Sequence, residues 1–330
     1  MPPSRLHHND TRRSDRGAID RVKQLDLEHR KRLRGAARLT LSLRFLSTAW
    51  ARLRGSTQPA RPLQVSHPPE GALAVTFVGH ATVMITTPRT RVLTDPMLDD
   101  FFFGLRRATA AGLHHADRDA VDLVLISHAH RDHLHDNSLR LLPSTARVIV
   151  PPRCGALVTR LGFDDVVELG PGASVSHKDV EITAVPARHS GVRGLGDYTR
   201  RGAAGYVLRS QGTTLYFAGD TAYFSGFAEI GRRFNPDVAL LPIGGYEPNG
   251  FRDQHMSPLD AVYAFEDLGA RVLIPINHGS FPLSYEPLEA PTAWLRQLAR
   301  QRGLVGTLND EDRRRVALLN NGETCAFRRR

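Results

Sequence analysis

Ser127-His128-Ala129-His130-Arg131-Asp132-His133 is the most informative part of the sequence, because it places three histidines and one aspartate within six positions. It follows the run Val121–Ile126, in which five of six residues are apolar, as expected of a buried strand. Imidazole and carboxylate groups are the ligands that first-row divalent metals, zinc above all, take from proteins. The stretch therefore predicts a metal site on the loop that ends a strand, where the ligands have a rigid base.

A solvated loop that is rich in histidine by chance is the alternative interpretation, since the chain has 15 histidines. Three further strand ends argue against chance. They are His189 after Val180–Pro186, Asp220 after Leu215–Gly219, and His278 after Arg271–Asn277. Four strand-like runs that end in metal-ligating residue types make the metal interpretation the stronger one.

The His-x-His-x-Asp-His pattern of residues 128–133, with the three later residues, resembles the metallo-β-lactamase superfamily. The resemblance implies an αββα sandwich, in which two sheets pack face to face with helices outside and metals at one sheet edge. Composition alone gives only an α/β or α+β class. The resemblance also implies the ligand sets: His128, His130 and His189 for the first metal, and Asp132, His133 and His278 for the second, with Asp220 bridging both.

Motifs between these ligands are similar to one branch of the superfamily, the N-acylphosphatidylethanolamine-hydrolysing phospholipase D and its bacterial relatives. They are Val78–Thr82, Leu93–Pro96, Leu125–His128, Phe217–Thr221, Pro242–Pro248, Gln254–Pro258 and Asn277–Phe281. The ascorbate-6-phosphate lactonase group is a more distant relative. The resemblance covers residues 73–325, and Arg131 departs from it, since the phospholipase often has an aromatic residue there.

The chemistry that the resemblance implies is hydrolysis of an ester-like bond by a hydroxide bridging two divalent metal ions, zinc above all. The leading prediction is a phospholipase D-like phosphodiesterase that acts on N-acylphosphatidylethanolamine or a related phospholipid. The alternative is a lactonase or a phosphoesterase for a small soluble substrate. A nuclease ranks third, because no RNA-binding appendage is recognisable, so nucleic acid is not an expected partner. A non-enzymatic metal-binding or membrane-interaction protein conflicts with the complete ligand set.

Four residues are predicted to act in catalysis: Asp132 and Asp220 at the metals, and His80 and His255 as phosphate contacts or as proton donors to the leaving alkoxide. Either of these two histidines could instead be structural. Asp95, after the run Arg91–Thr94, is expected to hydrogen-bond to ligand histidines and orient them, with a simple Asp-Pro turn as the alternative. The apolar run Phe101–Phe103 is predicted to be buried, with lipid contact as the alternative.

The net charge of +10 belongs to the N-terminal part of the chain, because residues 1–66 hold 15 basic and 5 acidic side chains and the remainder holds 29 of each. We therefore predict a basic arm over residues 1–70 and a hydrolase domain over residues 71–330. Leu39, Leu43, Leu46, Trp50 and Leu53 predict an amphipathic helix in the arm, although a strand remains open. Such a helix either packs on its own domain or lies on an anionic membrane.

Two cysteines far apart in sequence, Cys154 and Cys325, match no disulfide or metal pattern, which favours a reducing cytoplasm. No apolar run is long enough for a transmembrane helix, so any membrane association is expected to be peripheral. Pro59–Glu70 is interpreted as a linker. Helices are predicted at Gly155–Leu161, Gly226–Phe234, Pro258–Leu268 and Pro291–Gln301, the third with Ser257 as its N-cap.

Overall fold

The structure is a computed structural model that describes residues 57–60, 62, 64–193, 197, 201–306 and 314–328. All of these residues belong to one compact unit, Thr48–Arg330. The predicted basic arm lies mostly outside the described residues, so its helix and its boundary with the domain stay predictions. The segment interpreted as a linker contacts the domain, because Val65 N donates to Asp117 Oδ2 at 3.0 Å, and Gln58, just before the segment, forms a β-bridge with Thr109.

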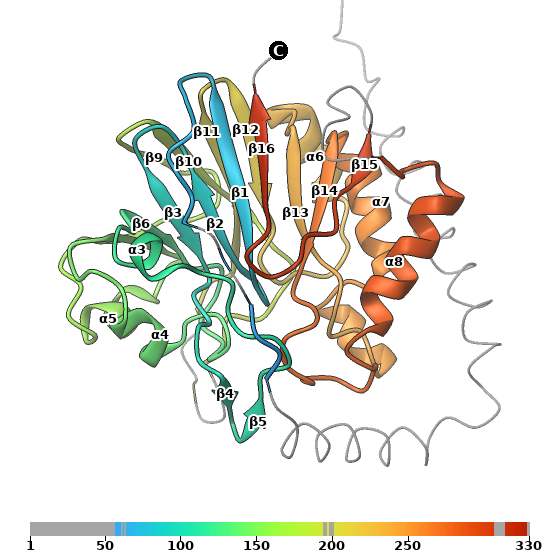
Figure 1. Ribbon diagram of the computed structural model, residues 1–330, viewed down its shortest axis with the longest axis horizontal. Helices are drawn as coiled ribbons and strands as arrows, with labels where there is room; N and C mark the ends of the chain where they lie inside the picture. The colour runs from blue at the N-terminus through green and yellow to red at the C-terminus, as the bar shows by residue number, and fades with distance from the viewer. Residues whose placement is uncertain are drawn as a thin grey trace, which may run out of the picture. The chain divides into compact units, whose positions relative to one another are not determined.

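Two seven-stranded sheets make up the domain. The first runs through β16 (Thr324–Arg328), β1 (Ala72–Gly79), β2 (Thr82–Thr86), β3 (Arg91–Thr94), β6 (Leu123–Leu125), β7 (Arg147–Val150) and β8 (Val166–Glu168). The second runs through β15 (Arg315–Val316), β14 (Val272–Ile276), β13 (Val238–Pro242), β12 (Thr213–Phe217), β11 (Ala204–Ser210), β10 (Val180–Pro186) and β9 (Ser174–His177). Figure 1 shows the sheets packed together with helices outside them, which confirms the αββα sandwich.

Side-chain alternation along each strand divides the core into layers. Leu123 and Leu125 join the apolar cluster that both sheets share, whereas Val124 joins the cluster outside the first sheet. In the second sheet Phe217 lies in the shared cluster and Tyr216 packs on the helices. Strands buried on both faces need apolar residues at every position, which is why the run before His128 lacks an alternating pattern.

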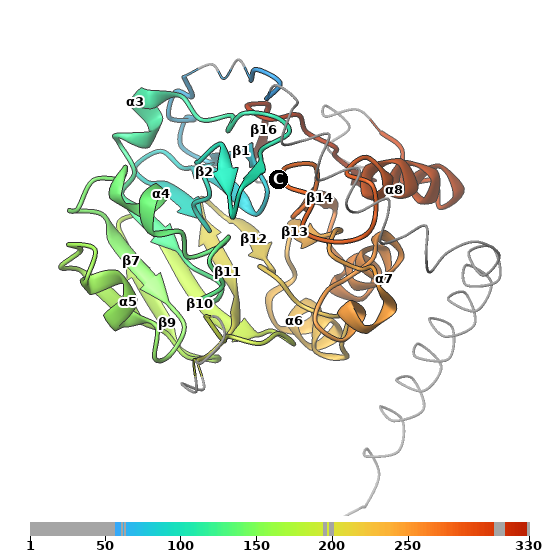
Figure 2. The same ribbon diagram turned by 90° about the horizontal axis from the view of Figure 1, so that it is seen from below.

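Helices cover the outer face of each sheet (Figures 1 and 2). In the described residues they are α3 (His115–Arg118), α4 (Asp136–Arg140), α5 (Gly155–Thr159), α6 (Gly226–Phe234), α7 (Pro258–Leu268), α8 (Ala290–Gln301) and the 3-10 helix η1 (Asn249–Asp253). The four predicted helices are confirmed. The predicted N-cap of α7 is confirmed as well, because Ser257 and Asp260 form a reciprocal capping box with Pro258 in the first turn. Within the described part of the chain, every helix is too short or too polar to span a bilayer.

A small hairpin of β4 (Phe101–Phe102) and β5 (Leu105–Arg106) projects beyond the ends of the two sheets (Figure 1). Its turn residues, Phe103 and Gly104, have φ angles of 46° and 79°, as hairpin turns of two residues favour. The predicted burial of the phenylalanine run is wrong for two of its three members. Phe102 is buried, but Phe101 is 50% exposed and Phe103 is 77% exposed, because alternation sends these two to the solvent side.

Candidate metal centre

The predicted site residues follow strands that run in one direction within each sheet. In the first sheet β1, β3 and β6 are mutually parallel, and they lead to His80, Asp95 and the ligand-rich stretch that begins at His128. In the second sheet β10, β12 and β14 are mutually parallel, and they lead to the segments that carry the later predicted ligands, His189, Asp220 and His278. The ends of parallel strands meet at one sheet edge, so these segments gather at one end of the sandwich, the end nearest the viewer in Figure 2.

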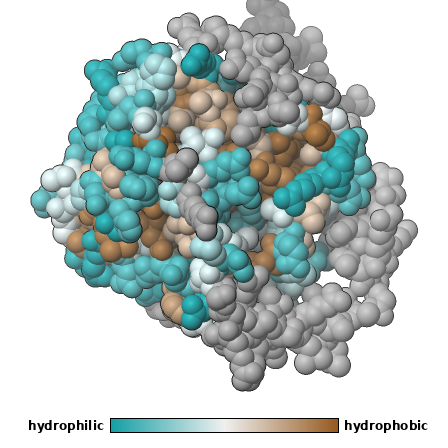
Figure 3. Space-filling view, in the orientation of Figure 1, coloured by the Kyte–Doolittle hydropathy of each residue, from teal (hydrophilic) through white to brown (hydrophobic). Residues whose placement is uncertain are grey.

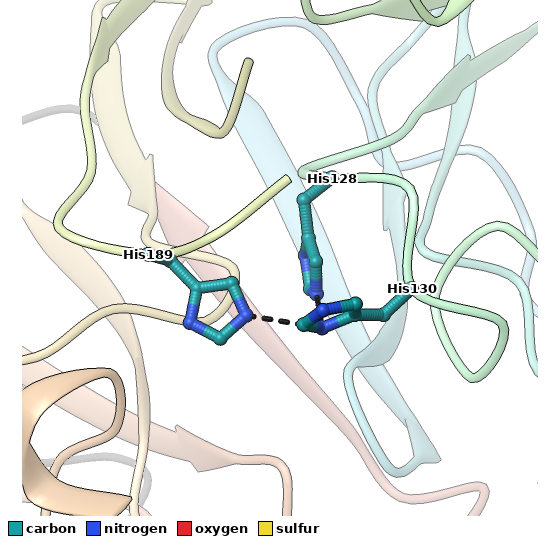
Figure 4. Close-up of side chains that lie close together, drawn as sticks. All are labelled: His128, His130 and His189. Carbon is teal, nitrogen blue, oxygen red and sulfur yellow. Dashed lines mark hydrogen bonds between the residues drawn. The ribbon is translucent and has the colours of Figure 1, made fainter. Parts of the chain in front are cut away.

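Three histidines meet in the first cluster (Figure 4). His130 Nδ1 lies 2.8 Å from His128 Nε2 and 3.1 Å from His189 Nε2. His189 Nδ1 donates to the Gln254 carbonyl at 2.8 Å, which leaves the Nε2 lone pair directed at His130. His128 Nδ1 lies 2.9 Å from Ser127 Oγ. The single Nδ1 atom of His130 cannot form good hydrogen bonds with two ring nitrogens at once. A cation between the three rings could instead accept a nitrogen lone pair from each of them.

Two carboxylates converge on His133 in the second cluster. The Nε2 atom of His133 lies 3.2 Å from Asp220 Oδ2 and 3.5 Å from Asp132 Oδ2, and has no hydrogen-bond partner. Its Nδ1 donates to Asp95 Oδ2 at 2.7 Å. Asp95 also accepts hydrogen bonds from Ser127 N at 2.7 Å and from Ser127 Oγ at 2.5 Å. Asp95 thus contacts one of the histidines that it was predicted to orient.

His80 and His278 lie differently from their predicted places. His80 Nε2 is 3.1 Å from Asp132 Oδ2, and His80 forms a group of potential metal ligands with Asp132 and His133. His278 belongs to no such group among the described residues. Its ring stacks on Phe77 with 5.1 Å between centroids, and its Nε2 is buried without a partner. The structure therefore brings His80 beside the residues with which the sequence grouped His278.

His255 lies against the predicted bridging carboxylate. Its Nδ1 is 3.5 Å from Asp220 Oδ2 and has no hydrogen-bond partner, and it forms a further ligand group with His189 and Asp220. A Cβ atom at Gly245 would lie 3.2 Å from the same nitrogen, so the glycine lets the backbone approach the ring. Asn277 Nδ2 donates to Asp220 Oδ1 at 2.6 Å and fixes the other side of this carboxylate.

Charge in the clusters is set by burial and by neighbouring groups. Burial lowers the pKa of His189 to about 4 and that of His128 well below its usual value, so both rings are neutral at neutral pH. Burial on its own would raise the pKa values of Asp132 and Asp220, but His133 holds both well below their usual range. The two effects have opposite signs at His133. Burial on its own would lower its pKa, but the surrounding carboxylates raise it well above its usual value.

These observations fit divalent cations. Neutral imidazoles and ionised carboxylates are the donors that such ions take from proteins. Buried nitrogen atoms without a hydrogen-bond partner occur at His133, His255 and His278. Buried polar atoms are normally paired, and the unpartnered His133 Nε2 and His255 Nδ1 lie 3.2 Å and 3.5 Å from Asp220 Oδ2, so a cation beside this carboxylate would complete the site.

A cavity of about 570 Å³ lies beside the clusters. One part of its wall consists of polar ligand groups: His80, His130, Asp132, Asp220, His255 and His278. Another part is apolar: Phe102, Phe103, Phe251, Phe281, Pro282, Leu283, Pro287, Leu288 and Pro291. Arg193 also lines it, fixed by the carbonyls of Ala129 and Leu134 and by an ion pair with Asp136. The exposed Arg131 lines it as well, without a hydrogen bond or ion pair to any described residue.

Ser127, Asn277 and Glu286 hold the site, although the sequence analysis assigned them no role. Ser127 and Asn277 each precede a predicted ligand and hydrogen-bond within the clusters, so their position next to a ligand was a usable signal. Glu286 is only 7% exposed and accepts hydrogen bonds from the N–H groups of Gly245, at 2.6 Å, and of the next two residues. Glu286 lies 41 positions after Gly245 in the sequence, and no local sequence pattern predicts a hydrogen bond between residues so far apart.

An αββα sandwich with histidine and carboxylate clusters at one end defines a metallo-β-lactamase-type protein. The family model described as "Beta-lactamase superfamily domain" matches residues 90–278, more than half of the chain. The chain belongs to the metallo-β-lactamase superfamily. Among solved structures, a possible metal-dependent hydrolase from Veillonella parvula has a TM-score of 0.63 and 21% identity, covering 76% of this chain and 98% of that one, which supports the fold.

Three relatives add detail to this membership. An uncharacterized protein of Mycobacterium tuberculosis is 34% identical over 72% of this chain and 68% of its own length. A UPF0173 metal-dependent hydrolase of Koribacter versatilis is 34% identical over 64% of this chain and 86% of its own length. N-acyl-phosphatidylethanolamine-hydrolyzing phospholipase D 1 of Caenorhabditis elegans is 31% identical over 65% of this chain and 66% of its own length. Together with the ligand clusters, these matches identify a metal-dependent hydrolase of the superfamily.

Proposed function

We propose that this hydrolase is a phospholipase D-like phosphodiesterase that acts on N-acylphosphatidylethanolamine or a related phospholipid. The observation that carries the proposal is the two-sided cavity, with ligand groups on one part of its wall and apolar side chains on another. A phospholipid presents the same pair of features, a phosphodiester beside acyl chains. The similarity to the C. elegans phospholipase supports the same substrate class.

Two metal ions, zinc above all, are proposed to occupy the centre. His128, His130 and His189 would hold the first, and Asp132, His133 and His278 the second, with Asp220 between them. His80 is the competitor for the place of His278, because its Nε2 lies 3.1 Å from Asp132. When bound, such ions would neutralise charge on phosphate oxygens and lower the pKa of bound water to near 7.

The side chains around the centre are proposed to position groups and to move a proton. Asp95 accepts a hydrogen bond from His133 Nδ1 and so keeps the Nε2 atom of His133 directed at Asp132 and Asp220. Asn277 holds Asp220 Oδ1 and leaves Oδ2 for the centre. Hydrolysis adds water oxygen to phosphorus and breaks the bond to the headgroup alkoxide, which needs a proton. His255 lines the cavity with an unpartnered Nδ1 and is the proposed donor.

A substrate panel on metal-loaded protein tests the proposal. The substrates are N-acylphosphatidylethanolamine, phosphatidylcholine, a soluble nitrophenyl phosphodiester and a lactone, with products identified by mass. The expected products from the first are phosphatidic acid and the N-acylethanolamine, and Asp220→Asn should abolish them. Turnover of the lactone alone would replace the proposal with the soluble-substrate alternative.

A further inference from the structure

Three phenylalanines are exposed near the cavity. Phe103 is 77% exposed, Phe101 is 50% exposed and Phe251 is 39% exposed. Phe103 and Phe251 line the cavity, from the β4–β5 hairpin and from η1 respectively, and Phe101 lies two residues from Phe103 in the same hairpin. Exposed aromatic side chains that gather around a cavity mark a surface that another molecule covers.

The hairpin gains little for folding from its exposed rings. Phe103 has a φ of 46°, a left-handed conformation that asparagine and glycine adopt more readily than a bulky residue does. Its ring contacts the ring of Phe102, with 4.6 Å between centroids. Figure 3 shows hydrophilic and hydrophobic areas side by side on this face, and atoms of both kinds adjoin at its lower edge, where Figure 1 places the hairpin.

Positive charge accompanies the exposed rings. Phe101 and Arg106 are partners across the hairpin, and the guanidinium lies 4.6 Å from the centroid of the ring. Arg106 forms no ion pair with a described carboxylate. Two acidic residues, Asp99 and Asp100, precede the hairpin, and both act electrostatically on the buried guanidinium of Arg107. The surface of the hairpin is therefore apolar with one unpaired cation.

We propose that the β4–β5 hairpin docks the mouth of the cavity onto a phospholipid surface. Phe101 and Phe103 enter the boundary between headgroups and acyl chains, and Arg106 contacts lipid phosphates beside them. Arg131, the unpaired cation of the cavity wall, meets the headgroup that enters. The inference rests on the proposed function and adds the surface through which a lipid substrate would reach the centre.

Vesicle sedimentation with the full-length, metal-loaded protein tests the docking surface. The vesicles contain phosphatidylcholine alone or with phosphatidylglycerol, in salt of roughly 0.5 M, so that charge on the N-terminal arm is screened. We expect Phe101→Ser and Phe103→Asn to lower the affinity for both vesicles at least tenfold. Arg106→Gln, compared with the wild type in salt of roughly 0.15 M, should lower the affinity for both vesicles, and more for the anionic ones. Val305→Ser, at a site 53% exposed and outside the cavity, is the matched control and should bind like the wild type.

The outcomes separate docking from catalysis. Phe101 does not line the cavity, so Phe101→Ser should keep its metal content and its turnover of a soluble phosphodiester, which shows that the variant is folded. Unchanged vesicle binding by both phenylalanine variants, an equal loss in Val305→Ser, or no binding by the wild type overturns the proposal. A wild-type dimer that Phe101→Ser converts to a monomer assigns the surface to a second copy of the chain and overturns it too. Vesicle binding through the hairpin without phospholipid turnover supports docking and refutes the proposed function instead.

Discussion

Replacing Asp95 by asparagine is expected to weaken metal binding through a residue that would not itself be a ligand. Asp95 is fully buried and accepts hydrogen bonds from Ser127 N, Ser127 Oγ and His133 Nδ1. Asparagine keeps one carbonyl oxygen but brings an amide N–H₂ against these donors. The φ of 32° at Asp95 lies toward the left-handed region, which asparagine tolerates, so the substitution adds no backbone strain.

The size of the effect follows from the hydrogen bonds. A bond to a charged acceptor contributes about 1.5–3 kcal/mol, and a buried donor without a partner costs about 1–3 kcal/mol. If the amide oxygen keeps one of the three bonds, the other two donors lose their partner, so the free energy of unfolding should fall by about 2–6 kcal/mol and Tm by about 5–20 °C. Loss of the bond that orients His133 should lower metal affinity about 10–100-fold.

Chelator competition measures the affinity, and thermal unfolding with and without metal measures the stability. Asp165→Asn is the control, because Asp165 is an exposed carboxylate that pairs with Arg147 at 2.8 Å away from the centre. The control should change stability by less than about 1 kcal/mol and leave metal affinity unchanged. Wild-type metal affinity in Asp95→Asn, or equal losses in the two variants, would refute the orienting role.

Four further outcomes are expected. Protein purified without chelator should carry more than one equivalent of divalent metal by elemental analysis, and chelation should abolish turnover until metal is restored. Asp220→Asn should lower kcat about 100-fold or more while the melting temperature of the metal-free protein changes little, because the predicted role is at the metals. Glu286→Gln should lower Tm by several degrees in thermal unfolding, since a charged acceptor of three buried N–H groups is lost. Removal of residues 1–56 should leave metal content and soluble phosphodiester turnover unchanged and reduce sedimentation with anionic vesicles at low salt only.

Much of the fold was predictable because strand and helix signals agree with the tertiary arrangement. The predicted helix Gly226–Phe234 has the same bounds in the structure, and Pro258–Leu268 begins at its predicted N-cap. Ligands at the ends of several strands also predicted the sandwich end at which they meet. The sandwich and its metal-binding end came from the resemblance to the superfamily, and the structure agrees because parallel strands place their ends together.

The arrangement within the site was less predictable. His80 and His278 both follow strand ends, and their distances to Asp132 depend on turns rather than on spacing. His80 itself has a φ of 59°, and Asn277, before His278, has a φ of 55°. Such left-handed residues redirect the chain within one position, and no apolar pattern records them. The burial of the hairpin was unpredictable for a related reason. Three consecutive phenylalanines carry no alternating pattern that would show which side chains face the core.

Metal binding should stabilise the ligand loops of this fold more than its two sheets. Asp95, His128 and His133 are fully buried, and Asp220 is 3% exposed, so ionised groups sit where unpaired charge is costly. The sheets that carry them are fixed by three large apolar clusters that do not depend on the ligands. The sandwich can therefore hold carboxylates and imidazoles close together before a cation balances them. A cation that binds there stabilises the folded state by its own binding free energy, and chelation should loosen the ligand loops before it unfolds the sheets.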